Sequence, residues 1–332
     1  MSGHAKMSEL KKKSGRGLPA LARSREERSQ GRMRWTSRVG SLFVGAFVAA
    51  LVVHWVVSTR DLSTRRQQLL ARQRAVVVTL GAEWFPLRDR IEANVLRTAT
   101  TDAPDWVSAV VRRGDFRSKP GLYLRMRLAD AKDALSIREA ASYAKRDAFA
   151  ACLLREPNES GRRGEIDGGA FPDQPWNLGQ AYAASRILSG TWVAAVTEAS
   201  DDLRLRIFAE QLDKAVREEI PRAVDIVKRA EFFLLVLDED VPEAKPLSEG
   251  AAISEESLQL IAHPARIRLF DLARGEEMLR LRRTGEARAL SVGERVVSDP
   301  EVRDAMKRQV NNCALAQRVE EALAEPGAPG SR

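Results

Sequence analysis

The longest apolar run of the chain extends from Val39 to Thr59 and lies between Arg38 and Arg60. As a helix rising 1.5 Å per residue, a run of this length reaches about 31 Å, the thickness of the hydrocarbon core of a bilayer. The run has no polar face, unlike a helix in a soluble core, and no small-residue cleavage site follows it, unlike a signal peptide. The pattern therefore predicts a retained single-pass transmembrane helix over residues 39–59.

Beyond Arg60, apolar residues recur at helical spacing up to about Ala99. The recurring residues are Leu69, Val76, Leu80, Trp84, Leu87 and Ile91. This spacing predicts a helical stalk over residues 60–99 that packs against the folded domain or against a second copy. Gly81 and Pro86 are expected to interrupt it.

Strict alternation of apolar and polar residues over Gly121–Leu128 predicts a half-buried strand. A helix over Asp130–Lys145 and a second, more buried strand over Ala148–Leu154 are expected to follow it as a parallel strand–helix–strand unit. The nearly continuous apolar run of Glu231–Asp240 predicts a central strand.

Other stretches complete the expected domain. Helices are expected around Trp106 to Val111, over Trp176–Glu198, and over Asp201–Ala230 with a break at Pro221. Strands are expected over Leu258–Ala262, Arg266–Leu272, Glu277–Arg283 and Ala289–Val297. A final helix is expected from Pro300, capped by Asp299, to Ala324. Together these elements predict an α+β domain over residues 100–325, with a mixed sheet, packed helices, and a C-terminal β-hairpin followed by a helix.

The net charge of +8 belongs to the N-terminal tail, because residues 1–38 contain 11 Lys and Arg against 3 Glu. This composition predicts a disordered tail, and residues 326–332 are expected to be a second one. Because cytoplasmic flanks of membrane helices are rich in Lys and Arg, the tail is expected in the cytoplasm and the domain outside it, as in a bacterial inner-membrane protein. A role of the tail in nucleic-acid binding is the weaker alternative.

Sequence signatures of common active sites are missing from the chain. No GxxxxGK[ST], GxSxG or HExxH occurs, and the three histidines are too few and too scattered for a multi-histidine metal centre, so no metal or cofactor is expected. His263, between two expected strands, is interpreted as a loop or packing residue. The best catalytic candidates are Asp238, Glu239 and Asp240 at the carboxyl end of the central strand, where they either act as general acid and base or merely solvate the strand end.

Arginines form a second candidate site on the expected hairpin. A three-residue turn, Ala273–Gly275, sets Arg268 opposite Arg280 and Arg266 opposite Arg282, while Ile267 and Leu269 face Leu281 and Leu279 on the other side. Arg125 and Arg127 are expected to extend the same arginine face if their strand is a neighbour. Such a face would bind phosphate or carboxylate groups, unless each guanidinium is already held by a carboxylate of the chain.

Only two cysteines are present, Cys152 and Cys313. Their spacing fits no zinc, haem or CxxC pattern. In an exported domain they would form a disulfide if their Cα atoms lie within about 7 Å of each other, and otherwise they would be two buried thiols.

These observations lead to one functional hypothesis and two alternatives. The leading hypothesis is a non-enzymatic, single-pass membrane protein of the cell envelope whose outer domain binds a partner protein, an envelope polymer or another anionic ligand. The alternatives are an envelope hydrolase that uses the carboxylates near Asp238, and a membrane-anchored protein that binds nucleic acid through its tail.

Overall fold

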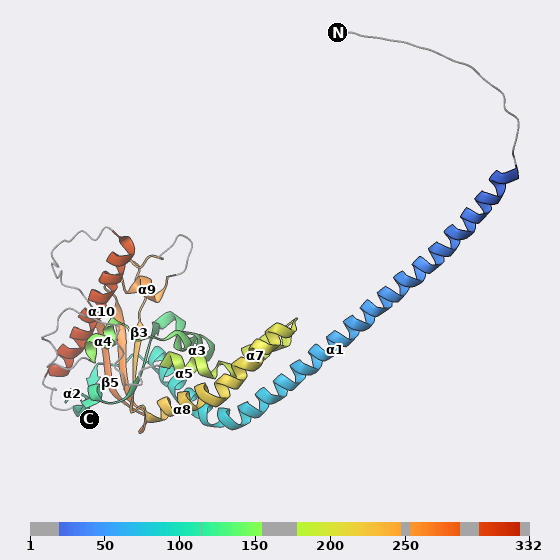
Figure 1. Cartoon of the computed structure of the whole chain (residues 1–332). Coiled ribbons are helices and arrows are strands. Elements are labelled where there is room, and N and C mark those ends of the chain that lie inside the picture. The colour runs from blue at the N-terminus through green and yellow to red at the C-terminus, as the bar shows by residue number, and fades with distance from the viewer. Residues whose placement is uncertain (1–19, 114, 155–177, 247–252, 286–298, 326–332) are drawn as a thin grey trace, which may run out of the picture. The chain divides into compact units, whose positions relative to one another are not determined.

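The chain divides into two compact units, Met1–Arg65 and Arg66–Arg332. The computed structural model describes residues 20–113, 115–154, 178–246, 253–285 and 299–325. Helix α1, Ala20–Thr100, contributes residues to both units (Figure 1).

Large apolar side chains of α1 are exposed in the first unit. Phe47, Val48, Leu51, Val52, Val53 and Trp55 are each between 51% and 66% exposed. Within the described residues, α1 is the one helix that is long and apolar enough to cross a membrane. The expectation of one long apolar helix is thereby confirmed at the level of length and composition.

The second unit contains one five-stranded mixed sheet with the strand order β1-β5-β4-β3-β2. Only the β2–β3 pair is parallel among the described strands, and the other three pairs are antiparallel. The strands are β1 Trp106–Val107, β2 Gly121–Arg127, β3 Phe232–Asp238, β4 Pro264–Asp271 and β5 Glu276–Thr284.

Helices account for most of the remaining described residues of this unit. The α-helices are α2 Ala109–Arg112, α3 Ala134–Tyr143, α4 Ala148–Leu153, α5 Leu178–Ala184, α6 Gly190–Glu198, α7 Asp202–Lys214, α8 Ile220–Arg229, α9 Glu255–Leu258 and α10 Pro300–Ala324. Short 3₁₀ segments lie at Asp115–Ser118, Leu128–Asp130 and Ser185–Leu188, and a π-helical turn at Ala215–Glu219 joins α7 to α8. A mixed α+β fold is therefore confirmed.

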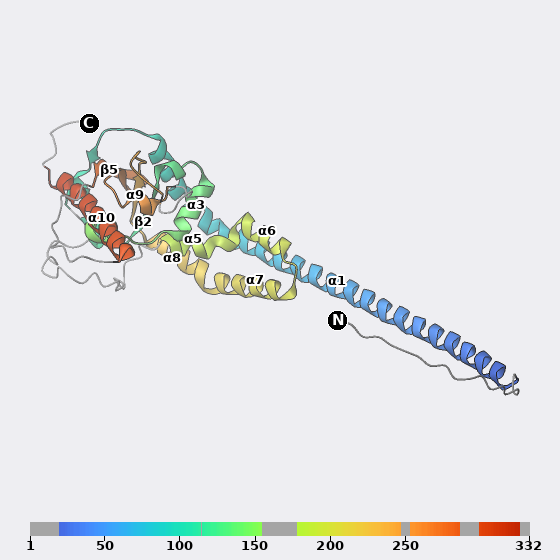
Figure 2. The ribbon, with the colours of Figure 1, turned by 90° about the horizontal axis from the view of Figure 1, so that it is seen from above.

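The sheet is covered by helices on both faces. Figures 1 and 2 agree that α4 and α10 lie on one face and that α3 and α5 lie on the other. On the α10 face, Leu234 and Ile267 pack in one core cluster with Phe149 of α4 and Leu315 of α10. Every residue of β3 is buried, as expected for a central strand between two helical layers.

The portion of α1 in the second unit packs against that unit's helices. Trp84 and Ile91 are at most 1% exposed, and the Trp84 ring meets the Tyr182 ring of α5 edge-on at 5.4 Å. Gln73 donates from Nε2 to the Ile187 carbonyl at 2.9 Å. Packing against the folded domain was one of the two expected roles of the stalk. The expected interruption was wrong, because α1 is continuous through Pro86.

The second strand expected at Ala148–Leu154 is wrong. This stretch is helix α4, and the Asp147 side chain caps it by accepting the Ala150 N–H at 3.0 Å. A short apolar run does not distinguish a buried strand from a buried helix, and alanine, frequent in this run, favours the helix. The parallel partner of β2 is therefore β3, which lies more than 100 residues further along the chain.

Two other expected elements differ from the structure. Leu258–Ala262 is not a strand: Leu258 is the last residue of helix α9, which begins at Glu255 after a capping box of Ser254 and Ser257, and residues 259–262 form a turn and loop. Trp106 and Val107 form the edge strand β1 and precede α2, in place of a single short helix. The strand expected at 289–297 lies outside the described residues, as does the start of the helix expected from Trp176.

Strands β4 and β5 pair antiparallel in a register that sets Arg266 opposite Arg282 and Arg268 opposite Arg280. The pairing shifts between Leu269 and Phe270, so Phe270 faces Glu277 and not Met278, which an unshifted register would place opposite it. Gly275 in the connecting turn has φ +71°, a left-handed conformation that costs glycine little. Asp299 caps α10 by accepting the Glu301 N–H at 2.9 Å, as the sequence predicts.

Candidate functional site

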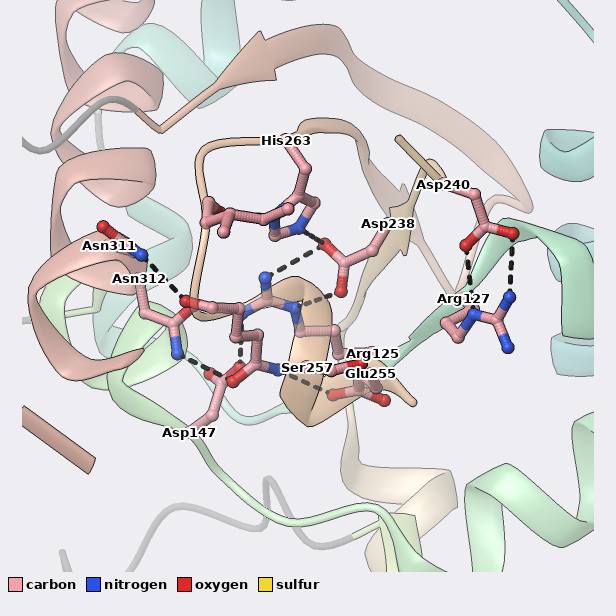
Figure 3. Close-up of polar contacts among 12 residues, drawn as sticks. Arg125, Arg127, Asp147, Asp238, Asp240, Glu255, Ser257, His263, Asn311 and Asn312 are labelled. Atoms are coloured by element: carbon pink, nitrogen blue, oxygen red, sulfur yellow. Dashed lines mark hydrogen bonds and ion pairs between the residues drawn. The ribbon is translucent and has the colours of Figure 1, made fainter. Parts of the chain in front are cut away.

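Asp238, the first of the predicted catalytic acids, lies at the centre of a buried polar cluster (Figure 3). It ends β3 and has no exposed surface. Arg125 of β2 donates to both of its oxygens, from Nε to Oδ2 at 2.7 Å and from Nη2 to Oδ1 at 3.0 Å. Burial alone would raise the pKa of Asp238, but Arg125 and His263 outweigh it and hold the pKa below its ordinary value. Asp238 is therefore an ionised carboxylate without access to a substrate.

His263 is the second cation of this cluster. Its Nδ1 lies 3.0 Å from the Ile261 carbonyl oxygen, and its Nε2 lies 2.9 Å from Asp238 Oδ1. Both oxygens only accept hydrogen bonds, so we infer that both ring nitrogens carry protons. Burial lowers the pKa of His263, but the Asp238 carboxylate outweighs burial and raises it above its ordinary value. The loop position expected for His263 is correct, and its ion pair with Asp238 was not predicted.

Asp147 is the second anion that Arg125 contacts. Arg125 Nη1 donates to Asp147 Oδ2 at 2.9 Å and to Asn312 Oδ1 of α10 at 2.8 Å. The Tyr123 hydroxyl donates to the same Asp147 oxygen at 2.8 Å, and burial is the main reason why the pKa of Tyr123 is raised. Four N–H groups of Arg125 are thus bonded, and its charge is matched by two carboxylates.

Glu255, the first residue of α9, is the third carboxyl group of the cluster. It accepts a hydrogen bond from Gln259 Nε2 at 2.9 Å and makes no ion pair with another described residue. Burial, followed by the nearby charge of Asp238, raises its pKa to about 8. Glu255 is therefore mostly protonated at pH 7.

Glu239 and Asp240, the other two predicted acids, are each paired with arginines. Glu239 Oε1 accepts from Arg266 Nε at 2.9 Å and from Arg282 Nε at 3.0 Å. Burial opposes the charge of Glu239, but these two arginines lower its pKa. Arg127 donates to both oxygens of Asp240, at 3.1 and 2.8 Å.

The guanidinium of Arg266, which lies on β4, also caps the C-terminal end of helix α1. Its Nη1 lies within 3.3 Å of the carbonyl oxygens of Thr98, Ala99 and Thr101. The last carbonyls of a helix have no partner within the helix, so a guanidinium satisfies them and complements the helix dipole. This arginine therefore has a structural role that the sequence pattern did not indicate.

Glu277 bridges the second pair of opposed arginines, Arg268 and Arg280, as Glu239 bridges the first. Its Oε1 lies 3.0 Å from Arg268 Nε and accepts from Arg280 Nε at 3.1 Å. Arg268 also donates from Nη1 to the carbonyls of Ile267 and Leu281. Burial, only partly offset by Glu277, lowers the pKa of Arg268 to about 10.

An open pocket of about 330 Å³ lies beside these arginines. It is lined by Asp102, Ala103, Pro104, Asp105, Arg266, Arg268 and Arg282. Asp105 accepts the Arg282 backbone N–H at 2.9 Å and pairs with the Arg283 guanidinium. Two aspartates and three arginines therefore line the pocket, and it lacks the strong excess of positive charge that would favour an anion.

The expected single arginine face is wrong. Arg125 is opposite Val236, which is opposite Ile267, so Arg125 lies on the face of Ile267. Arg268 follows Ile267 and lies on the other face, because alternate residues of a strand point to opposite sides. All six predicted arginines are also held by carboxylates: Arg125, Arg127, Arg266, Arg268, Arg280 and Arg282. An anion-binding face would require guanidinium groups that no carboxylate of the chain already holds, and none of these six meets that requirement.

Cys152 of α4 and Cys313 of α10 form a disulfide with a Cα–Cα distance of 5.4 Å. The predicted proximity is correct, although Cys152 lies in a helix and not in a strand. Asp147 precedes α4, and Asn312 lies next to Cys313 in α10. The disulfide therefore joins the two elements whose residues Asp147 and Asn312 accept hydrogen bonds from Arg125.

The basic residues 1–19 of the tail lie outside the described residues, so the nucleic-acid alternative stays a prediction.

Several members of the buried cluster were missed by sequence reasoning. Asp147, Glu255, Gln259 and Asn312 come from three separate parts of the chain and share no motif. The aspartate before the alanine-rich run is a helix N-cap signal that would have identified α4. No local sequence signal connects Asp147 to Arg125.

Comparison with known proteins gives no relative: no family model, no curated protein and no solved structure matches this chain.

Proposed function

We propose that this protein is a single-pass membrane protein whose folded domain binds a partner and performs no catalysis. The observation that carries the proposal is the apolar segment of α1 around Phe47–Trp55, whose large side chains are more than half exposed. Six such side chains on one helix have a large unfavourable free energy in water, and a bilayer removes them from it.

The proposed orientation has the N-terminus in the cytoplasm and the domain on the extracytoplasmic side of a bacterial inner membrane. The Lys and Arg residues of positions 1–38 support it, because such residues resist translocation. The disulfide between Cys152 and Cys313 also supports it, because disulfides persist mainly in oxidising compartments.

A binding role is favoured over the envelope hydrolase because of how the acids are held. A catalytic carboxylate must reach its substrate, whereas Asp238 is fully buried between Arg125 and His263. Glu239 and Asp240 are both engaged by arginines. The proposed partner is another protein of the envelope, since the arginines that would favour an anionic ligand are neutralised within the chain.

Two reporter fusions to the full chain test the orientation. A reporter active only outside the cytoplasm is expected to be active after Arg332 and inactive before Val39. The opposite pattern would overturn the orientation. Release of the protein from membranes by alkaline carbonate would overturn the anchor itself.

Crosslinking of the full chain in intact cells tests the binding role. The expected result is one dominant adduct with an envelope protein, retained when Asp238 is replaced by Asn in a protein that still folds. Turnover of an envelope substrate that is lost in Asp238→Asn and retained in Asp240→Asn would support the hydrolase instead.

A further inference from the structure

Helices α6 and α7 form a helical hairpin that packs beside α1 (Figure 2). The Trp192 ring of α6 meets the Phe208 ring of α7 edge-on, with 5.7 Å between the ring centroids. Asp213, near the end of α7, pairs with Arg72 of α1. The hairpin is therefore held both by contacts between its own helices and by α1.

The turn of this hairpin lies at the start of the second unit. Before α6, the Ile187 carbonyl accepts a hydrogen bond from Gln73 Nε2 at 2.9 Å. After α6, the Ala199 carbonyl accepts one from Arg66 Nη2 at 2.6 Å. Arg66 is the first residue of the second unit and follows Thr59, the last residue of the apolar run, by seven positions. Seven residues span about 10 Å as a helix and at most about 25 Å as an extended chain, so a bilayer that holds the apolar run lies within that distance of Arg66.

Two large apolar side chains are exposed beside this turn. Leu203 and Ile207 of α7 are 67% and 45% exposed. Residues four positions apart on a helix lie on the same face, so these two side chains form one apolar surface. Leu205 and Leu212 of the same helix are at most 4% exposed and supply its inward face, so the exposed pair is not part of the hairpin core. Single exposed apolar residues are common in proteins, but this pair lies where the chain arrives from its apolar segment.

The charged groups around this surface balance one another. The side chains of Arg204 and Arg206 are 65% and 69% exposed, and each pairs with an aspartate of the same turn. Such exposed pairs contribute little free energy, and long arginine side chains can reach the phosphates of lipid headgroups. Together with Arg66 and Glu198, the turn contains three arginines and three acids. A surface with no net charge and two apolar side chains fits the boundary between headgroups and acyl chains of zwitterionic lipid.

We propose that residues 199–207 are a membrane-contact surface, at which Leu203 and Ile207 enter the headgroup region of the bilayer that holds α1. The inference rests on the proposed membrane anchor. Two side chains bury too little apolar area to bind a bilayer from solution. The anchor keeps them within reach of the lipid, so the contact forms at a high effective concentration. The contact fixes which side of the folded domain faces the membrane.

Fluorescence quenching of the full chain in lipid vesicles tests this contact. Ser200→Cys places a dye in the exposed turn, and the two native cysteines do not react because they form a disulfide. The vesicles consist of phosphatidylcholine, part of which carries a nitroxide quencher in the upper acyl chain. The dye is expected to be quenched by this lipid. Adding Leu203→Ser and Ile207→Ser is expected to reduce the quenching at least about twofold, because the apolar surface that enters the bilayer is lost.

Leu135→Ser, in the same dye-labelled chain, is the matched control. Leu135 is 66% exposed and, like Leu203, is the second residue of its helix. Its helix α3 contacts α1 at Glu92, through Arg138, much further along the chain from the apolar run than Arg66. This variant is expected to leave the quenching unchanged. All three substituted side chains are exposed, so the variants are expected to fold.

Three results would overturn the contact: no quenching by the nitroxide lipid, equal quenching when Leu203 and Ile207 are both Ser, or a loss of emission that depends only on the number of protein copies per vesicle. The last result would assign the surface to a second copy of the chain. Alkaline carbonate separates these outcomes from failure of the anchor. Release of the protein from the vesicles would overturn the anchor and the contact together, whereas retention without quenching would overturn the contact alone.

Discussion

At the residue scale, the charged side chains of this domain are organised by pairing between distant positions. Glu239 and Glu277 each bridge two arginines that the β4–β5 register sets opposite one another. Like charges directly opposite on neighbouring strands are unfavourable, and a shared carboxylate offsets that repulsion. The arginine pattern that resembles a ligand surface in the sequence is therefore part of the fold.

Replacing Asp238 by Asn is expected to destabilise the domain by about 3–5 kcal/mol, because Arg125 and His263 would stay buried without their anion. Asp240→Asn is the matched control. It breaks a pair whose carboxylate is more than a third exposed, so the expected loss is below about 1 kcal/mol. Urea unfolding of both variants gives the comparison, and equal losses would show that the buried cluster has no special role in stability.

The free energy of unfolding is expected to be highest near pH 5 and to fall on both sides. Below that pH, Asp238 becomes protonated and its contribution, present above its ordinary pKa of 3.8, is lost. Above it, stability falls because folded Glu255 and His263 hold protons more tightly than in the unfolded chain, whose ordinary pKa values are 4.5 and 6.5. Urea unfolding from pH 3 to 9 checks the profile, and stability that rises from pH 5 to 9 would contradict it.

At the element scale, short helices and turns join the strands at defined places. Asp147, Ser189, Asp201 and Asp299 each accept a backbone N–H at the start of a helix. The β4–β5 connection depends on Gly275, the one described glycine with positive φ. Such local features are the most predictable part of the fold, because each acts over a few residues.

Gly275→Ala is expected to destabilise the domain by about 1–2 kcal/mol, since a Cβ atom is unfavourable in the left-handed region. Space is not the reason, because nothing lies within 4 Å of an added Cβ. Gly190→Ala is the control: it has the same free space but lies at the start of α6 with ordinary φ, so no loss is expected. Thermal unfolding of both variants separates backbone strain from the loss of glycine as such.

At the scale of the whole molecule, one covalent bond joins distant parts of the second unit. The Cys152–Cys313 disulfide spans 161 residues of sequence and connects α4 to α10 on one face of the sheet. A cross-link over so long a segment restricts the unfolded chain strongly.

Replacing both cysteines by alanine is expected to lower the free energy of unfolding by about 2–4 kcal/mol. A reducing agent is expected to lower the stability of the wild type by a similar amount and to leave the double variant unchanged. If reduction has no effect on the wild type, the disulfide does not form in the protein as isolated.

The sequence alone determined the features that depend on neighbouring residues. The long apolar helix, the buried strand β3, the start of a helix near Pro221 and the capped start of α10 follow from hydrophobic periodicity, length, proline position and cap residues. The proximity of Cys152 and Cys313 also followed, although from a wrong secondary structure for Cys152.

Only the tertiary structure decided which strand pairs with β2, which arginines share a face and which carboxylate each arginine binds. Arg125 and Asp238 are separated by 113 residues, and Arg266 meets the end of α1 across more than 160. Alternation within a strand defines its two faces, but which face lies beside which neighbour depends on register between strands. Register arises from packing of the whole domain, so no local pattern contains it.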